Sequence, residues 1–139
     1  MQDSPNKERG GNLTTIEELQ NVRELIQLYI EGSDGDATKL RRAFHPDARM
    51  VGRIGDEDGN SPIGGFIAWV AENPGLAGPD YQALIRSIDL TGDAGVVILV
   101  EKDYFGCDFV DYFSVARTKG VWQIVNKTYQ VTGGAPPTH

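Results

Sequence analysis

The spacing of hydrophobic residues changes from helical to alternating at Tyr81, and this change constrains the fold more than any other feature of the chain. From there to Val131, apolar residues recur at about every second position in four runs: 81–91, 94–104, 107–117 and 121–131. Three short breaks of hairpin length separate the runs: Thr91-Gly92-Asp93, Phe105-Gly106 and Thr118-Lys119-Gly120. The pattern predicts four antiparallel strands in succession.

Helical spacing dominates the residues before Tyr81. Ile16, Val22 and Tyr29 belong to a periodic apolar face that ends at Gly32, which predicts an amphipathic helix over 15–31. Two shorter helices are expected, one capped by Asp36 and ended by Pro46, and one capped by Ser61 with Pro62 in its first turn. Between them, alternation over 49–54 predicts a strand, followed by a polar turn over 56–60.

Helices followed by hairpin-linked strands indicate an α+β fold, with N-terminal helices packed on a curved, mostly antiparallel sheet. The chain has 139 residues, which is the size of one domain. We expect that domain to cover 13–131. Residues 1–12 contain Met1 as their single apolar residue and are expected to form a disordered tail, and 132–139 a flexible tail.

Composition argues against several classes of function. A formal net charge of −7 argues against nucleic acid and anionic membranes as partners, because both require clustered Lys and Arg. Cys107 is the single cysteine, which excludes a cysteine-based zinc site. A calcium-loop pattern starts with Asp56, Asp58 and Asn60, but Ser61 stands where glycine is required. We therefore expect no metal and no cofactor. No signal-peptide pattern precedes the first helix, so a cytoplasmic location is expected.

Two residues are candidates for proton transfer, and each has a structural alternative. His45 is the one histidine outside the C-terminal tail and can act as an acid or a base. Alternatively, its ring closes the corner between helix and strand by bonding to the backbone or to Asp47. Asp111 lies among aromatic residues, a setting that favours a proton-carrying carboxyl group, but it can equally form a cross-strand ion pair.

The partner of Asp111 depends on the last hairpin. A three-residue loop over Thr118-Lys119-Gly120 places Lys127 directly opposite Asp111, which predicts a partly buried ion pair. A two-residue loop instead places Lys127 opposite Tyr112. In the three-residue register, Phe109, Phe113 and Tyr129 share the face of the pair.

Several segments resemble the nuclear transport factor two-like superfamily, in particular its branch named putative lumazine-binding, near the polyketide cyclase-like group. They are Tyr-Ile-Glu-Gly at 29–32, Leu-Arg-Arg-Ala-Phe-His-Pro-Asp-Ala at 40–48, Asp-Tyr-Phe-Ser-Val at 111–115 and Trp-Gln-Ile-Val-Asn-Lys at 122–127. The resemblance covers roughly 13–131. It implies a cone, in which the sheet curls around the first helix and encloses a hydrophobic pocket, and a homodimer formed through the outer face of the sheet.

Three functions are compatible with such a cone. The first is a small-molecule-binding protein of unknown ligand, and the second is an isomerase, cyclase or dehydratase that uses Asp111 or His45. The third is a protein-interaction module whose cone is filled by side chains. The site residues of ketosteroid isomerase and of the two-histidine dehydratases have no matching positions here. The candidate pocket residues are Tyr29, Phe44, Trp69, Phe109, Phe113, Lys127 and Tyr129.

Overall fold

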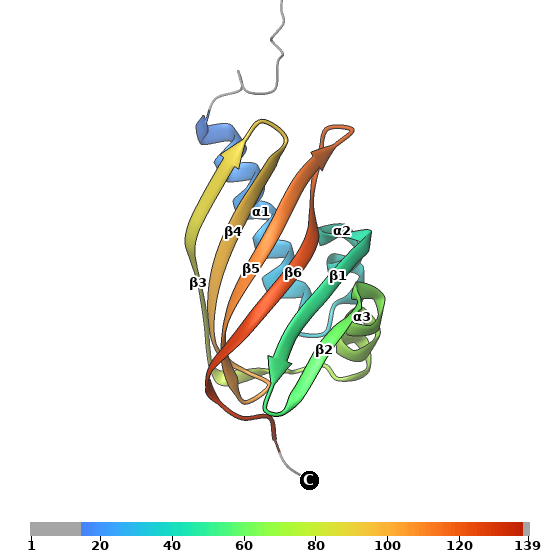
Figure 1. The fold of residues 1–139 in the computed structure, drawn as a ribbon, viewed down its shortest axis with the longest axis vertical. Helices are drawn as coiled ribbons and strands as arrows, with labels where there is room; N and C mark the ends of the chain where they lie inside the picture. Colours follow the sequence, from blue (N-terminus) through green and yellow to red (C-terminus); the bar gives the residue numbers. More distant parts are fainter. Residues whose placement is uncertain (1–14, 138–139) are drawn as a thin grey trace, which may run out of the picture.

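In the computed structural model, which describes residues 15–137, three helices cover one face of a curved six-stranded sheet (Figure 1). The expected tail over 1–12 lies outside the described residues. In chain order the elements are α1 (Thr15–Gly32), α2 (Ala37–Ala43), β1 (Phe44–Ile54), β2 (Glu57–Pro62), α3 (Ile63–Glu72), β3 (Ala77–Thr91), β4 (Ala94–Tyr104), β5 (Cys107–Thr118) and β6 (Val121–Gly134).

The strands lie in the order β2-β1-β6-β5-β4-β3. The pair β1 and β6 is parallel and the other neighbours are antiparallel. Register shifts interrupt most of the pairings, including one at 85–87 in β3 and one at 114–115 in β5. Such bulges bend a strand and increase its twist, so they account for the curvature that lets the sheet wrap around the helices.

Helix α1 follows the predicted bounds closely because its apolar face is continuous. Val22, Ile26 and Tyr29 are almost completely buried against the concave face of the sheet. The helix ends at Gly32, where a Cβ atom would lie 2.8 Å from the Leu40 side chain. The closeness of α1 and α2 therefore requires glycine at this position. Within residues 15–137, no helix is long and apolar enough to cross a membrane.

The polar turn expected over 56–60 is wrong, because most of this segment belongs to strand β2. Gly55 and Asp56 alone form the turn, and the next six residues pair with β1 along the edge of the sheet. Gly55 has a φ of 60°, in the left-handed region that a tight hairpin uses. The segment carries no apolar residue before Pro62 because its side chains are largely exposed, and for that reason alternation did not reveal it.

Three element ends also differ from expectation. Helix α3 begins at Ile63 with Pro62 at the cap position, and no side chain caps it, so the expected Ser61 cap is wrong. Strand β1 begins at Phe44, before Pro46, because pairing with β6 starts at that residue. Strand β6 continues to Gly134, three residues past the expected strand end, since Cys107 in β5 still pairs with it.

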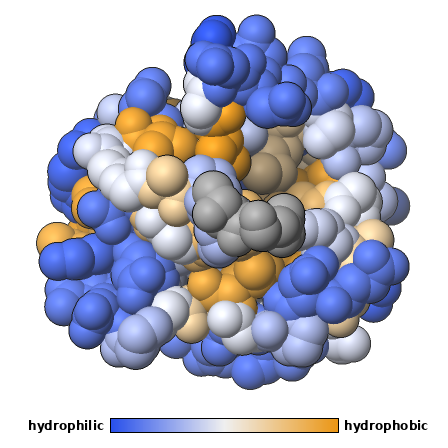
Figure 2. Space-filling view, turned by 90° about the horizontal axis from the view of Figure 1, so that it is seen from below, coloured by the Kyte–Doolittle hydropathy of each residue, from blue (hydrophilic) through white to orange (hydrophobic). Residues whose placement is uncertain are grey.

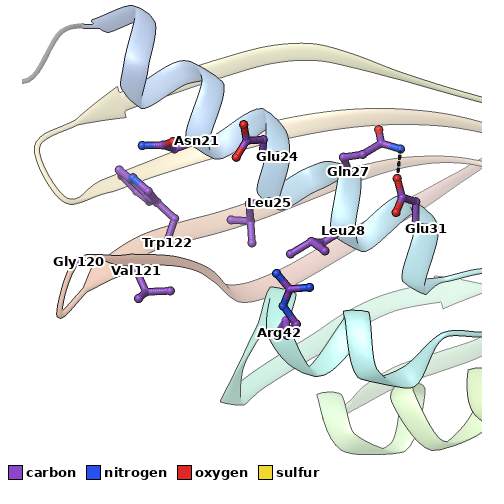
Figure 3. A pocket seen from close by; sticks show the side chains of 10 residues that line it. All are labelled: Asn21, Glu24, Leu25, Gln27, Leu28, Glu31, Arg42, Gly120, Val121 and Trp122. Carbon is purple, nitrogen blue, oxygen red and sulfur yellow. Dashed lines mark hydrogen bonds between the residues drawn. The ribbon is translucent and has the colours of Figure 1, made fainter.

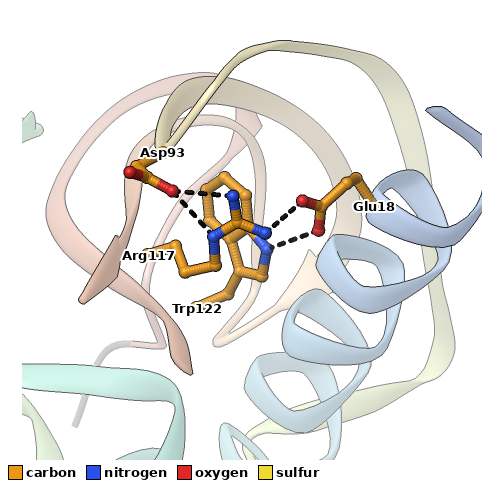
Figure 4. A network of polar contacts seen from close by, with 4 residues as sticks. All are labelled: Glu18, Asp93, Arg117 and Trp122. Carbon is orange, nitrogen blue, oxygen red and sulfur yellow. Dashed lines mark hydrogen bonds and ion pairs between the residues drawn. The ribbon is translucent and has the colours of Figure 1, made fainter. Parts of the chain in front are cut away.

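A polar network fastens α1 to one end of the sheet, at the top in Figure 1. The Arg117 guanidinium contacts the carboxylates of Glu18 and Asp93, and the Trp122 indole N–H donates to Glu18 Oε1 at 3.1 Å (Figure 4). The Arg117 guanidinium also lies 5.3 Å from the centre of the Trp122 ring, so a cation–π contact adds to the ion pairs. The polar groups of the network bond to one another, which indicates a structural role.

The opposite end of the sheet carries the β1–β2 and β4–β5 turns (bottom in Figure 1). Here a second small cluster of buried side chains, Tyr104, Cys107 and Phe109, is separate from the main core. The main core fills the middle of the molecule with residues such as Leu99, Phe113 and Ile124. A cavity lies between these two clusters, inside the curl of the sheet.

Candidate functional site

The cavity inside the sheet has a volume of about 40 Å³ and brings together side chains from four strands, the β4–β5 turn and two helices. Seven of its residues are aromatic, and three others are ionisable residues that lie deep inside. The lining residues are Tyr29, Met50, Ile54, Phe66, Trp69, Glu101, Tyr104, Phe105, Phe109, Asp111, Lys127 and Tyr129. Figure 2 shows hydrophobic side chains gathered around a hollow at this end of the molecule.

The three ionisable side chains come from adjacent strands and are all buried. Glu101 in β4 is 2% exposed, Asp111 in β5 is 1% exposed and Lys127 in β6 is 5% exposed. Strand alternation points them into the cone, because each follows the same inward face as buried apolar neighbours such as Leu99 and Phe113. Burying ionisable groups is costly unless they are paired or hydrogen-bonded, so their convergence marks this cavity as the candidate site.

Lys127 is held by aromatic rings and a tyrosine hydroxyl. Its Nζ donates a hydrogen bond to Tyr29 Oη at 2.6 Å. The same nitrogen lies 4.5 Å from the ring centre of Phe66, 5.0 Å from that of Tyr29 and 5.6 Å from that of Tyr129. Cation–π contacts of this kind stabilise an ammonium group. Among the residues that the structure describes, no carboxylate oxygen comes within 4 Å of it.

Asp111 is only partly satisfied. Tyr29 Oη donates to its Oδ2 at 3.5 Å, which is long for a hydrogen bond between oxygen atoms. Its Oδ1 is buried and receives no hydrogen bond from any N–H or hydroxyl group in the described part of the chain. The remaining neighbour is the carboxyl group of Glu101, which contacts Asp111 closely enough to share a hydrogen bond with it when protonated.

Glu101 is the group that holds that proton. Burial raises the pKa of its carboxyl group well above the ordinary value, and the charge of Asp111 and the hydrogen bond to Asp111 act in the same direction. Lys127 and the hydroxyl of Tyr81 oppose the rise in pKa without cancelling it. Tyr81 Oη donates to Glu101 Oε2 at 2.6 Å. Glu101 and Asp111 are therefore a carboxyl pair in which Glu101 holds its proton to a higher pH than an ordinary glutamate does.

The tyrosines of the cavity remain hydroxyl donors. Burial, followed by the charge of Asp111, raises the pKa of Tyr29 well above its ordinary value. Burial, followed by the charge of Glu101, also raises the pKa of Tyr104, whose hydroxyl donates to the Ser33 carbonyl at 2.7 Å. The cavity thus brings together the Lys127 side chain, two carboxyl groups and phenols that keep their protons.

The expected register between Asp111 and Lys127 is wrong. The last hairpin has the two-residue turn Lys119-Gly120, and a bulge between Ser114 and Val115 then shifts the pairing by one residue. As a result Lys127 pairs with Phe113, and Asp111 pairs with Tyr129. Both side chains still face the cone, and the Tyr29 hydroxyl lies between them instead of a direct ion pair.

The other candidates fall into two groups. Tyr29, Trp69, Phe109 and Tyr129 line the cavity together with Asp111 and Lys127. Phe44 and Phe113 lie behind it, where their rings pack edge-on against Tyr29 with centres 5.8 and 4.8 Å away, so they belong to the core that fixes Tyr29.

His45 lies away from the cavity, at the corner between α2 and β1. Its Nδ1 accepts a hydrogen bond from the backbone N–H of Asp47 at 3.0 Å. The ring borders a separate surface hollow of about 330 Å³, formed with Pro46 and the first residues of α3. This position matches the structural alternative for His45 and keeps it out of contact with the carboxyl pair.

Among the polar residues around the carboxyl pair, sequence reasoning missed Glu101 and Tyr81. It also missed five lining residues: Met50, Ile54, Phe66, Tyr104 and Phe105. Glu101 directly follows the apolar run Val96-Val97-Ile98-Leu99-Val100. It continues the inward phase of Val97 and Leu99, and that phase was the available signal. No comparable signal marked Tyr81, because it reaches Glu101 only through an irregular pairing of β3 with β4.

A larger hollow of about 710 Å³ lies on the other side of α1, facing solvent (Figure 3). Side chains of α1 such as Glu24 and Leu28 form one wall, and Arg42 and Trp122 contribute the other. Its polar side chains are exposed, and Gln27 and Glu31 hydrogen-bond to each other at 2.8 Å. No buried polar group points into it from residues 15–137, so the smaller cavity remains the candidate site.

Comparisons with known proteins agree on the fold and leave the chemistry open. The family described as Putative lumazine-binding matches residues 17–130. NTF2-like proteins of unknown function from Shewanella baltica OS155 and Silicibacter pomeroyi DSS-3 each give a TM-score of 0.78 at 28% identity. These alignments cover 88% and 86% of this chain and 99% of each relative. Aldolase FrzH from a Cladobotryum species is 25% identical over 117 residues, which are 83% of this chain and 92% of the aldolase. The expected fold class is confirmed.

Proposed function

Because this chain belongs to the Putative lumazine-binding family of the NTF2-like fold, we propose that it is a small-molecule-binding protein whose ligand occupies the cone cavity. One observation carries the proposal: the buried Asp111 Oδ1, which lacks an N–H or hydroxyl donor inside an aromatic cavity. An unsatisfied buried acceptor costs about 1–3 kcal/mol. A ligand with an apolar body and a hydroxyl or N–H group supplies that donor. If the ligand also carries a carbonyl group, its oxygen accepts a hydrogen bond from Lys127.

The polar groups argue against a cone that serves only as a filled scaffold. Replacing a buried ionic cluster by apolar residues is often neutral or stabilising, so a scaffold has no need of three buried ionisable groups. The present volume of about 40 Å³ is nevertheless far below the roughly 300–1,000 Å³ of ordinary ligand sites. A ligand therefore enters by displacing a side chain. Phe105, in the β4–β5 turn against Trp69, can rotate outward without disturbing the sheet.

Binding can be tested with phenol and toluene, which differ by one hydroxyl group, in a Phe105→Ala variant with an enlarged cavity. We expect phenol to bind about tenfold more tightly than toluene by NMR titration, because its hydroxyl donates to Asp111. Adding Asp111→Asn should remove the preference, and adding His45→Ala should leave it unchanged. Equal affinities for phenol and toluene would count against the proposal. Native mass spectrometry of the wild-type protein would then identify a ligand retained during purification.

A second function, proton-transfer catalysis on a carbonyl compound, is favoured by the carboxyl pair. Asp111 is placed to act as the base, and Glu101 as the acid that returns a proton, while Lys127 and Tyr29 stabilise negative charge on a carbonyl oxygen. Such a set suits isomerase, cyclase or dehydratase chemistry. It also suits aldol chemistry, in keeping with the aldolase among its relatives.

Catalysis can be tested by deuterium exchange into a simple ketone such as cyclohexanone in D₂O. We expect the wild-type protein to exchange the hydrogens next to the carbonyl group at least about 100-fold faster than Asp111→Asn, the usual contribution of a positioned base. His45→Ala serves as the control and should exchange at the wild-type rate. If all three proteins exchange at the same rate, binding without catalysis is the remaining function.

We also propose a homodimer through the outer face of the sheet, in the cytoplasm, where the free and buried Cys107 would stay reduced. Leu84, Val96 and Tyr112 are 67%, 43% and 41% exposed on strands β3 to β5.

Light scattering should give about twice the chain mass of 15.2 kDa. Leu84→Glu should halve that mass, whereas Val121→Glu, at an apolar residue that is 56% exposed at the start of β6, should not. A monomeric wild-type protein would refute the dimer.

A further inference from the structure

Tyr81 reaches the carboxyl pair because β3 is irregular at its beginning. Ala77 pairs with Tyr104 and Gln82 with Lys102, so the four residues 78–81 lie opposite Asp103 alone. The Asp103 carboxylate holds this bulge: its Oδ2 accepts from the backbone N–H of Asp80 at 2.9 Å, and it would clash with any Cβ atom at Gly78. Bulges often redirect a side chain at a functional site, and this one directs the Tyr81 hydroxyl toward Glu101.

The contact completes a chain of hydrogen bonds across the cavity. Lys127 Nζ donates to Tyr29 Oη, which donates to Asp111 Oδ2, and Asp111 contacts the Glu101 carboxyl group. Tyr81 Oη donates to Glu101 Oε2 at 2.6 Å and ends the chain on the side of the edge strand. Tyr81 is half-buried and does not line the cavity, so a bound ligand does not need to touch it.

We propose that Tyr81 is a positioning residue that fixes the Glu101 proton on the oxygen facing Asp111. The inference rests on the proposed role of Glu101 as the acid of the pair. A protonated carboxyl group has one O–H donor and one carbonyl oxygen. Because the carbonyl oxygen is the better acceptor, donation by Tyr81 to Oε2 leaves the proton on Oε1. From there it is shared with the neighbouring Asp111 carboxylate.

Infrared spectroscopy tests this directly, because a protonated carboxyl group has a C=O stretch separate from that of carboxylates. At neutral pH the wild-type protein should show this band, and Glu101→Gln should remove it. Tyr81→Phe should move the band to higher frequency, since the C=O group loses its hydrogen bond. Tyr104→Phe removes another buried hydroxyl of the cavity, one that bonds to the Ser33 carbonyl instead, and it should leave the band in place.

Each outcome separates the positioning role from the proposed function. A band that does not move in Tyr81→Phe overturns the positioning role, even if the protein binds a ligand or catalyses deuterium exchange into the ketone. A band absent from the wild-type protein overturns both the positioning role and the acid role of Glu101. If the band moves as expected but ketone exchange is undetectable, the positioning role stands and catalysis fails. Where exchange is present, Tyr81→Phe should slow it by about tenfold, the value of one hydrogen bond.

Discussion

Replacing Lys127 by methionine should lower the free energy of unfolding by about 3–5 kcal/mol at neutral pH, the largest loss that we expect from any single change in the cavity. Methionine preserves the apolar contacts of the side chain with Phe66 and Tyr129. It removes the one positive charge among the described cavity residues, and the Asp111 carboxylate is then buried beside a second carboxyl group without compensation. Urea denaturation followed by tryptophan fluorescence measures the loss.

The double variant shows whether the loss comes from charge. Asp111→Asn alone should also be strongly destabilising, because it leaves the Lys127 ammonium group buried without a counter-charge. Combining Asp111→Asn with Lys127→Met makes the cluster neutral, so the double variant should be more stable than either single variant. Lys102→Met, at an exposed lysine in β4, should change stability by less than about 0.5 kcal/mol. Losses that simply add would show that the two charges do not interact.

The fold could be predicted from the sequence because its signals are local and repeated. The apolar face of α1 and the alternation through β3, β4, β5 and β6 each extend over ten residues or more, so a single irregular position does not hide them. Strand β2 could not be predicted in this way. It is an exposed edge strand whose pairing with β1 is decided by the Gly55-Asp56 turn rather than by buried side chains.

The site was less predictable because it depends on small offsets between strands. Alternation alone placed Asp111 and Lys127 on the same face as Phe109, Phe113 and Tyr129, and both residues line the cavity. Their mutual position was not predicted. The register shift between Ser114 and Val115 changes the partners of Ser114 and earlier residues in β5, and of Asn126 and later residues in β6. Tyr81 depends on a second bulge. Propensities do not specify the bulge in β3, because contacts of Asp103 on the neighbouring strand hold it.

Glu101→Gln should make the folded protein more stable than the wild type at neutral pH, which is unusual for a change at a buried polar residue. Burial and the charge of Asp111 raise the pKa of Glu101 well above its ordinary value in the folded protein. In the unfolded chain a glutamate has a pKa of about 4.3. Above that pH the unfolded chain releases the proton while the folded protein keeps it, so the wild type loses stability as the pH rises toward the raised pKa.

Glutamine imitates the protonated side chain without titrating. Its carbonyl oxygen can accept from Tyr81 and its amide can donate to Asp111, so the folded contacts are retained. The advantage of Glu101→Gln should be absent below about pH 4 and should grow by about 1.4 kcal/mol per pH unit above about 4.3, until the folded protein also loses its proton. Urea denaturation at a series of pH values measures this slope.

Glu57→Gln removes the same charge at an exposed position in β2 and controls for the change in net charge. If Glu101→Gln were instead less stable than the wild type, by a margin that widens with pH, Glu101 would be ionised. The prediction that Glu101 keeps its proton would then be wrong. A gain in stability combined with loss of ketone exchange would have a different meaning. It would show that the chain keeps Glu101 at a cost to stability, which is expected of a group that serves function.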